Sequence, residues 1–418
     1  MNRKVIPVPE ADFDSLVTLI GNAYPGLKLN TADSIWSFKE RMLKTLADDS
    51  GSRIYGVYEE EQLLGTMRLY DFQMNLFGVS LLAGGVGMVA VDMLHKKEKV
   101  AKDLVDSYLR HYLDKGAAMA LLYPFRTDFY KKMGFGMGTK MSKYRIPPSN
   151  FPKGAGKAHL FFAKPDDSGE IAACYQRFMR TVNGLIERSR EELSRLVEHP
   201  DHRTVCFRKD GKVLGYMVYT FKNINEENIM QNDLIIREWV YETPEALQEM
   251  CSFLHSQSDQ INRVVFYTQD EYFHFLFDDP RNETYRVLPH VYLESNTQGV
   301  GVMYRILSVK RFFQQVAHHC FGGQTLTLAL TVRDTFLREN DGSLTIRFEE
   351  GYPVITDDAA GDVVMEVDIA ELSSLVMGAV TLKGLLKHGL VTLSDMAYAD
   401  QLHQLFLTSE KPMCMTAF

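Results

Sequence analysis

Residues 81–103 join a buried strand, a short basic turn and an amphipathic helix without a break. The strand ends in Val89-Ala90-Val91, Lys96 and Lys97 follow in the turn, and apolar residues then recur at helical spacing from Val100 onward. At the start of such a helix, unpaired backbone N–H groups and the helix dipole favour a phosphate group, and lysines add positive charge. The stretch therefore fits either a phosphate-binding turn or an ordinary strand–helix connection with a solvated lysine pair.

A second stretch favours the phosphate-binding alternative. Residues 117–123 have the pattern of a buried strand, and the segment F-Y-K-K-M-G-F follows over residues 129–135. Together the two stretches resemble the acetyl-CoA site of the GNAT N-acetyltransferases. In that family a strand ending V-x-V leads into a basic turn that holds the pyrophosphate, and the tyrosine of an F-Y-x-x-x-G-F segment is the general acid. The residues that match here are Val89, Val91, Lys96, Lys97 and Tyr130.

Bulk properties narrow the class of protein. A chain of 418 residues is long enough for about two to four domains. Its formal net charge of −8 argues against a nucleic-acid partner, because nucleic-acid binders usually present a basic face. Five scattered cysteines fit reduced thiols better than a disulfide framework.

Nothing in the sequence predicts a membrane span or a secretory signal. The opening residues contain basic side chains but no apolar segment of sufficient length. The longest weakly polar run, residues 79–91, is shorter than the roughly 20 residues that a spanning helix needs. We therefore expect a cytoplasmic location and no membrane partner.

Local patterns predict a first α/β domain over residues 1–150 with a central mixed sheet. Polar residues 59–62 predict the turn of a hairpin, and Gly116 predicts a helix end. The expected elements are a strand at 2–7, helices at 10–24 and 31–49, a hairpin of 53–58 with 63–72, a strand at 79–91, a helix at 98–115, a strand at 117–123, a short helix at 127–133 and a closing strand at 140–146.

A weak internal sequence repeat predicts a second domain of the same kind over residues 151–298. Leu64-Gly65-Thr66-Met67 recurs as Leu214-Gly215-Tyr216-Met217, and the predicted helix 244–257 and strand 262–267 follow it. Where the first copy has its basic turn, the second reads R-E-W-V-Y-E-T-P-E-A-L-Q-E. It has no paired lysines, so we interpret it as a degenerate copy without a phosphate site.

A third domain is predicted over residues 299–418. A helix at 310–318 precedes strands at 324–331, 343–349 and 362–368, and short helices at 369–376, 381–386 and 396–407 follow. This region resembles sterol-carrier-like α+β domains. The predicted fold class is therefore α/β and α+β multidomain, with tandem GNAT folds followed by a sterol-carrier-like domain.

The three-part order, with a final phenylalanine, resembles one family over essentially the whole chain: the enhanced intracellular survival (Eis) type of N-acetyltransferase. The resemblance implies acetyl transfer from acetyl-CoA to a primary amine such as an aminoglycoside, a polyamine or a lysine side chain. It implies Tyr130 as general acid, the terminal carboxylate of Phe418 as base, and a homo-hexamer.

The chemistry explains why such groups are needed. An amine attacks only as the free base, so a protonated acceptor must lose a proton. A free α-carboxylate, with a pKa of about 3.3–3.7, is ionised and accepts that proton if it is well positioned. The departing thiolate needs a proton, and a tyrosine is a suitable donor. Backbone N–H groups near Val89 and Val91 would bind the thioester carbonyl.

The candidate cofactor-binding residues surround the strand end, the turn and the mouth of the next strand. They are Val89, Ala90, Val91, Lys96, Lys97, Glu98, Lys99, Val100, Ala101, Lys102, Phe125 and Arg126. Lys99 stands where the family usually has glycine, which lets the backbone approach the pyrophosphate closely. The alternative function is therefore a non-catalytic CoA-binding or small-ligand-binding scaffold that has lost tight acetyl-CoA binding.

Two further constellations have competing interpretations. Trp36 and Phe38, on a predicted first-domain helix, either line the acceptor cleft or belong to the core. His318-His319-Cys320 contains metal-ligand types, but consecutive helical residues point in different directions. We therefore expect no metal.

Overall fold

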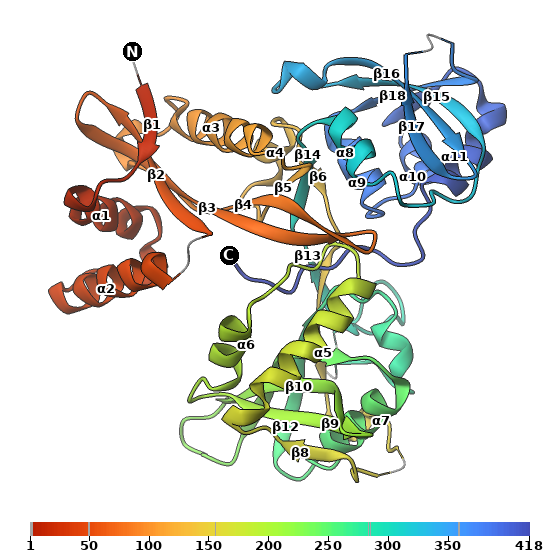
Figure 1. Cartoon of the computed structure of the whole chain (residues 1–418). Coiled ribbons are helices and arrows are strands. Elements are labelled where there is room, and N and C mark those ends of the chain that lie inside the picture. The colour runs from red at the N-terminus through yellow and green to blue at the C-terminus, as the bar shows by residue number, and fades with distance from the viewer. Residues whose placement is uncertain (1–2, 49–50, 155, 283, 285, 358–359) are drawn as a thin grey trace. The chain divides into compact units, whose positions relative to one another are not determined.

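The computed structural model describes residues 3–48, 51–154, 156–282, 284, 286–357 and 360–418. The chain divides into two compact units (Figure 1), one of residues 1–138, 302–409 and 417–418, and one of residues 139–301 and 410–416. The first unit holds two sheets and the second unit holds one. The predicted starts and ends at residues 2 and 49 fall outside the described residues.

The first sheet has seven strands in the order β1-β2-β3-β4-β5-β14-β6. Strands β1 to β4 are antiparallel neighbours, β4 and β5 are parallel, and β14 is antiparallel to both β5 and β6. The strand bounds are β1 Arg3–Pro7, β2 Ser52–Glu59, β3 Gln62–Leu76, β4 Val79–Val91, β5 Met119–Leu122, β6 Gly136–Met137 and β14 Met303–Ile306.

Helices cover both faces of this sheet (Figure 1). On one face α1 (Phe13–Ala23) and α2 (Ala32–Asp48) bury a cluster that includes Leu16 and Ile54. On the other face α3 (Val100–Asp114) buries residues at helical spacing, among them Leu104 and Tyr108, in a separate cluster. The short helix α4 (Thr127–Lys131) follows β5.

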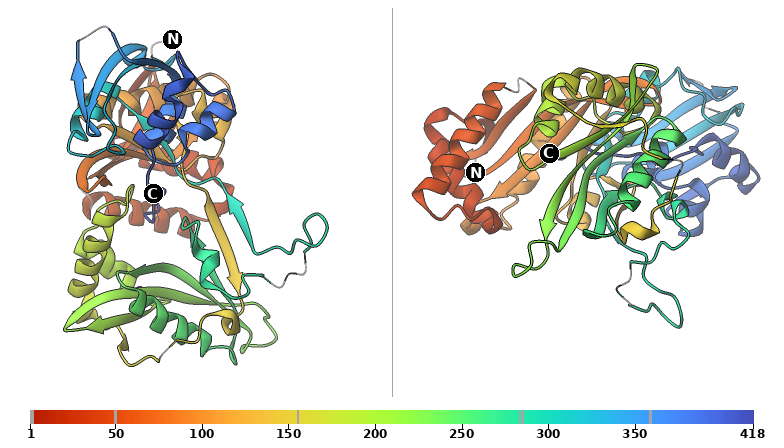
Figure 2. Two further views of the ribbon diagram at one scale, coloured as in Figure 1. Left: turned by 90° about the vertical axis from the view of Figure 1, so that its right-hand side faces the viewer. Right: turned by 90° about the horizontal axis from the view of Figure 1, so that it is seen from below.

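The second sheet, in the other unit, has the order β13-β7-β12-β11-β10-β9-β8. Helix α5 (Ser168–Thr181) buries one face and α7 (Pro244–His255) the other, and α6 (Arg190–Val197) packs on α5 (Figure 2). The strand bounds are β7 Met141–Ile146, β8 Leu160–Phe162, β9 Arg203–Lys209, β10 Lys212–Asn223, β11 Asn232–Tyr241, β12 Ile261–Thr268 and β13 Asn296–Gly299.

Two segments lie in different parts of the fold from those the sequence predicted. The strand at 140–146 does not close the first sheet, because β7 pairs with β12 and β13 of the second. The segment that begins at Met303 does not start the third domain, because β14 lies between β5 and β6 of the first sheet. Nearness in sequence suggested the wrong partners, and nothing in a local pattern encodes pairing across such distances. The domain boundaries at residues 150 and 298 stay a prediction.

The third sheet has the order β17-β16-β15-β18-β19. Its strands are β15 Leu326–Arg333, β16 Gly342–Glu349, β17 Tyr352–Thr356, β18 Val363–Asp368 and β19 Val391–Leu393, with helices α8 Val309–Gln315, α9 Ile369–Val376, α10 Leu382–Lys387 and α11 Ala399–Leu405. The sequence predicted most of these elements but missed β17 and β19, which are the two edge strands of this sheet.

The third domain packs on the first sheet through α9 and a buried ion pair. Arg305, on β14, is fully buried and its Nη2 donates to Asp334 Oδ2 at 2.7 Å. A Cβ atom at Gly134 would lie 1.3 Å from Arg305 Nη1, so glycine alone leaves room for the guanidinium. Ser374 Oγ, on α9, donates to the Met137 carbonyl at 2.9 Å.

No helix among the described residues is both long enough and apolar enough to span a lipid bilayer.

Candidate active site

Strand β4 separates from β5 halfway along its length. The parallel pairing runs from Ala83 opposite Met119 to Val86 opposite Leu122 and stops there. Pairing with β3 continues to Val91, but the register shifts between Arg68 opposite Gly87 and Thr66 opposite Ala90. Met88 lies in this irregularity with a left-handed φ of 49°, as expected of a β-bulge. Beyond Val86, one edge of β4 is therefore not paired with β5.

Phe418 lies where the two strands part. The carbonyl carbon of Phe418 is 3.0 Å from the position that a Cβ atom would take at Gly87. The Phe418 ring contacts Tyr70, Phe72 and Tyr123, with centroid distances of 5.7, 4.9 and 5.0 Å. The end of the sequence thus packs against the same strand that leads into the basic turn.

Tyr130, on α4, is buried among aromatic rings. Its ring meets those of Phe125, Phe129 and Phe135 edge-on, at centroid distances between 5.1 and 5.9 Å. Burial, with a smaller effect from nearby Tyr24, raises the pKa of Tyr130 well above its ordinary value. At neutral pH the hydroxyl therefore keeps its proton and has one to donate.

Tyr24 comes close to the same strand end, just after α1. Its hydroxyl donates to the Val89 carbonyl at 2.8 Å. Burial raises the pKa of Tyr24 as well. Because its proton is already engaged by a backbone oxygen, Tyr24 is a weaker candidate for a proton donor than Tyr130.

The basic turn between β4 and α3 has an unusual backbone. Lys97 and Lys99 both adopt left-handed conformations, with φ of 71° and 69°. Lys99 is the N-cap of α3 and makes no side-chain cap hydrogen bond. Within the described part of the chain, no carboxylate pairs with Lys96, Lys97 or Lys99, and all three are exposed. The turn therefore offers uncommitted cations beside the first N–H groups of a helix, which is a suitable site for a pyrophosphate.

Lys99 has a left-handed backbone conformation, which a glycine would adopt without strain. This conformation is less favourable for a residue with a side chain by roughly 1–2 kcal/mol, so Lys99 strains the turn.

The remaining predicted cofactor residues flank this turn. Val89 and Val91 are half-buried at the strand end and Ala90 is buried. Val100 is buried at the start of α3, Ala101 is half-buried, and Lys102 Nζ lies 5.6 Å from the centre of the Phe336 ring. Glu98 is turned toward Arg3 and His95.

Phe125 and Arg126, which follow the C-terminal end of β5, are exposed to solvent. Phe125 is 67% exposed, and the Arg126 guanidinium pairs with Asp128.

The two predicted acceptor residues differ in environment. Trp36 is 64% exposed on α2, whereas Phe38 packs against the core cluster under α1 and α2. Phe38 therefore has the core environment of the competing interpretation, and Trp36 alone remains available to a ligand.

The His318-His319-Cys320 segment makes contacts typical of structural residues. His319 stacks on Phe77 at 4.0 Å, and burial lowers its pKa to about 4. His318 Nε2 lies 3.1 Å from the Phe77 carbonyl oxygen, and Cys320 Sγ donates to the Glu350 carbonyl. In the described ranges no three His, Cys, Asp or Glu side chains form a metal-binding group.

The matching position of the second domain is closed. Helix α7 begins at Pro244, directly after the N-cap Thr243, whose side chain accepts from the Ala246 N–H. Proline has no N–H, so two of the groups that would bind a phosphate are missing or occupied. Glu238, on β11 of the same sheet, accepts from Arg188 at 2.7 Å in a buried pair.

Comparison with known families agrees with this architecture. Residues 4–138 and 184–306 each match an acetyltransferase (GNAT) domain model, and residues 309–415 match a sterol carrier protein domain. The chain therefore belongs to the GNAT acetyltransferases, with two GNAT domains followed by a sterol carrier protein domain. Its enzyme class and fold class are those that the sequence predicted.

Solved structures give the fold of the whole chain in more detail. The chain is similar over its full length to Eis1 from Mycobacterium abscessus, with a TM-score of 0.75 and 19% identity, each chain being covered completely. It is also similar over its full length, with 20% identity and a TM-score of 0.82, to a protein of unknown function from Enterococcus faecalis described as a probable N-acyltransferase. The fold is thus that of Eis1.

A curated relative matches only part of the chain. An uncharacterized N-acetyltransferase of Streptomyces avermitilis is 23% identical over 216 residues, which are 48% of this chain and 53% of the relative. The match spans about half the length of that protein.

Several site residues were missed by the sequence argument. Tyr24, and the rings of Tyr70, Phe72 and Tyr123 that surround Phe418, carry no local signal. Gly87 did carry one, because a glycine inside a strand often marks a bulge or a close backbone approach.

The strained turn generates a prediction. Replacing Lys99 by glycine removes one positive charge but relieves the left-handed conformation, so the CoA dissociation constant should fall or stay within about threefold. Lys96 has an ordinary φ of −65°. Lys96→Gly therefore also removes one positive charge, but it relieves no backbone strain. It should weaken binding more than Lys99→Gly does, as measured by calorimetry. A weakening by Lys99→Gly of more than tenfold, about 1.4 kcal/mol, would instead make Lys99 a direct phosphate ligand.

Proposed function

We propose that the protein transfers an acetyl group from acetyl-CoA to a primary amine through a ternary complex. One observation carries this proposal. In one domain, the end of the β4–β5 pairing leaves an edge of β4 open, and the helix N-terminus that follows β4 has exposed lysines that pair with no carboxylate among the described residues. Membership of the GNAT acetyltransferases implies the use of acetyl-CoA. The acceptor is an aminoglycoside, a polyamine or a lysine-type amine.

The cofactor is held by three parts of the chain. The pyrophosphate lies on the N–H groups of residues 97–102, with Lys96, Lys97 and Lys99 supplying charge. The thioester arm lies along the unpaired edge of β4, where backbone N–H groups near Val89 and Val91 stabilise the developing oxyanion. Phe125 and Arg126 lie at the mouth of β5 and contact the cofactor from that side.

The two proton transfers are assigned to Tyr130 and to Phe418. The carboxylate that Phe418 carries as the last residue of the sequence accepts the proton of the attacking amine. Packing of the Phe418 ring on three aromatic side chains, and its approach to Gly87, support a fixed position for that carboxylate. Tyr130 keeps its proton at neutral pH, as a donor to the departing thiolate must.

The acceptor site and the setting of the protein are also proposals. Trp36 is the one predicted acceptor residue with enough exposed surface to meet a substrate. We place the protein in the cytoplasm as a homo-oligomer, a hexamer by resemblance to the Eis type.

The alternative, a non-catalytic scaffold, is motivated by Lys99 and by the degenerate second domain. The match of residues 4–138 to an acetyltransferase domain and the exposed lysines of the turn make the enzyme the better supported function.

Acetyl-CoA binding tests the proposal most directly. Titration calorimetry should give a dissociation constant in the range of about 1 μM to 1 mM that is typical of enzyme substrates. Turnover is then followed by thiol release with a panel containing an aminoglycoside, a polyamine and a lysine peptide. No binding heat with millimolar acetyl-CoA or CoA would end the enzyme proposal and leave the scaffold alternative.

A carboxylate base makes the chain end sensitive to extension. Adding a few glycines after Phe418 converts the carboxylate to an amide, and turnover should fall by about a hundredfold, the loss that a misplacement of roughly 1 Å can cause. The control carries the same glycines at the N-terminus. Acetyl-CoA affinity should be unchanged in both. Equal turnover in the two proteins would exclude the terminal base.

The acid is tested by a pair of matched substitutions. Tyr130→Phe removes the hydroxyl and should lower kcat by about a hundredfold, within the range for general acid catalysis, while acetyl-CoA affinity stays within threefold. Tyr24→Phe removes a hydroxyl that is engaged by Val89 and should lower kcat far less. The opposite ranking of the two variants would assign the acid to Tyr24.

A further inference from the structure

We infer that Arg3, in the first strand of the sheet, is a positioning residue that holds the pyrophosphate-binding turn in its binding conformation. The inference rests on the proposed acetyl-CoA site. Arg3 lies 95 residues before Glu98 in the sequence and is not among the proposed cofactor-binding residues.

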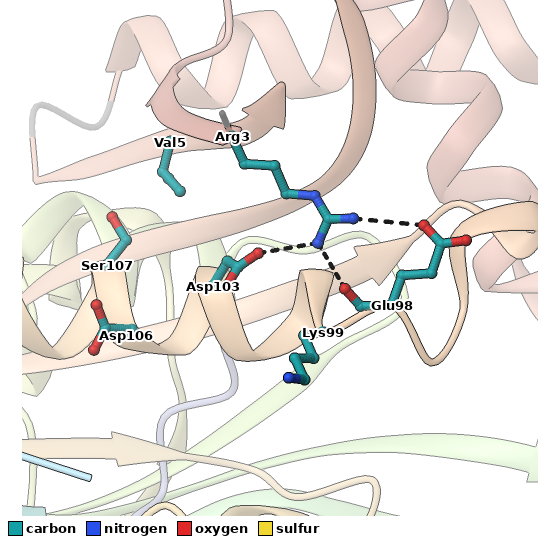
Figure 3. Close-up of a pocket in the computed structure, with 7 residues that line it drawn as sticks. All are labelled: Arg3, Val5, Glu98, Lys99, Asp103, Asp106 and Ser107. Atoms are coloured by element: carbon teal, nitrogen blue, oxygen red, sulfur yellow. Dashed lines mark hydrogen bonds and ion pairs between the residues drawn. The ribbon is translucent and has the colours of Figure 1, made fainter. Parts of the chain in front are cut away.

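Arg3 contacts both the turn and the helix that follows it (Figure 3). Its Nη1 donates to the Glu98 carbonyl at 2.6 Å and to Asp103 Oδ2 at 3.2 Å. Its Nη2 lies 3.5 Å from Glu98 Oε2, and its Nε lies 3.7 Å from Glu59 Oε1. The Arg3 side chain is only 12% exposed, so these contacts are partly shielded from water.

The turn needs such a support because its own backbone is strained. Glu98 lies between two left-handed lysines, each of which disfavours this conformation. Inside the turn, the Glu98 N–H makes only a long hydrogen bond of 3.4 Å to the His95 carbonyl, and the N-cap of α3 has no side-chain bond. Arg3 links the strained segment to Asp103, in the first turn of α3, and to β1, which is paired with β2 along its whole length.

Charge gives Arg3 a second effect on the same site. Glu59, Glu98 and Asp103 place three carboxylates near the start of α3, and uncompensated they would repel a pyrophosphate. Arg3 pairs with all three, whereas the Lys99 side chain points away from it (Figure 3). A planar guanidinium can reach a carbonyl and two or three carboxylates at once, and a lysine ammonium cannot do so with the same geometry.

The test compares two acetyl donors. Acetyl-CoA uses the turn through its pyrophosphate, whereas S-acetylpantetheine has no phosphate and does not. In Arg3→Met the KM for acetyl-CoA should rise at least tenfold while kcat changes less than twofold, and kcat/KM for S-acetylpantetheine should be unchanged. Arg3→Lys should recover part of the loss. Arg110→Met is the matched control, because Arg110 forms two ion pairs further along the same helix. This variant should leave kcat/KM unchanged for both donors.

A double substitution tests the strain argument. If Arg3 holds the left-handed turn, Arg3→Met should cost less acetyl-CoA affinity in a Lys99→Gly background, where the strain at residue 99 is relieved. An additive loss would show that charge alone connects Arg3 to the site and would overturn the positioning role.

Other outcomes are also decisive. An unchanged KM for acetyl-CoA in Arg3→Met overturns the inference, and so does an equal loss of kcat/KM with both donors. If Arg3→Met does not fold, the same measurements are made on Arg3→Lys and judged by the same criteria. Absence of acetyl-CoA binding by the unaltered protein would instead refute the proposed function itself, so the two failures are distinguishable.

Discussion

The parting of β4 from β5 is the constraint on which the site depends. Two parallel strands that stay paired satisfy each other's backbone groups and leave no room for a ligand between them. Here the pairing ends at Val86 and Leu122, so the edge of β4 from Gly87 to Val91 needs other partners. Tyr24 supplies one for the Val89 carbonyl, and Phe418 packs where a side chain at Gly87 would otherwise lie. A cofactor arm would pair with the rest, as ligands commonly do at the carboxyl ends of strands in open α/β sheets.

The other edge of β5 is paired with β14, which is linked to the third domain through Arg305. β14 pairs with β5 on the side away from β4, and its Arg305 is anchored by Asp334, which also accepts the N–H groups of Phe336 and Leu337. A buried charge without its partner is strongly destabilising, so the first sheet and the sterol carrier protein domain depend on one another in this unit. Gly134 belongs to the same F-Y-x-x-x-G-F segment as Tyr130, and its missing side chain makes room for Arg305. One segment thus carries the proposed acid and the packing site for another domain.

How far the sequence predicts such a structure depends on the range of each interaction. Helical spacing and caps are local, and for this reason α3, α9 and β4 lie close to where their patterns predict them. The turn chemistry at Lys96 and Lys97 is also local, and so is the glycine signal at Gly87. The choice of pairing partner for a strand is not local. β7 and β14 have ordinary strand patterns, and nothing in those patterns says which sheet each strand joins. Arg3 and Tyr24 act on the site across 65 residues or more, and no spacing rule connects them to it.

The two GNAT domains show how little separates a binding turn from a closed one. In the first, eight residues from Asp92 to Lys99 separate β4 from α3 and present exposed lysines. In the second, only Glu242 and Thr243 separate β11 from α7. Threonine caps the second helix with its own side chain, and Pro244 removes an N–H, so the helix end is satisfied internally. The first helix has no such cap at Lys99, and its strained turn is held from outside by Arg3. When the first N–H groups of a helix have no side-chain cap and the turn before them is held by another residue, those N–H groups stay free to bind an anion. A helix that is capped by its own N-cap side chain has fewer N–H groups to offer.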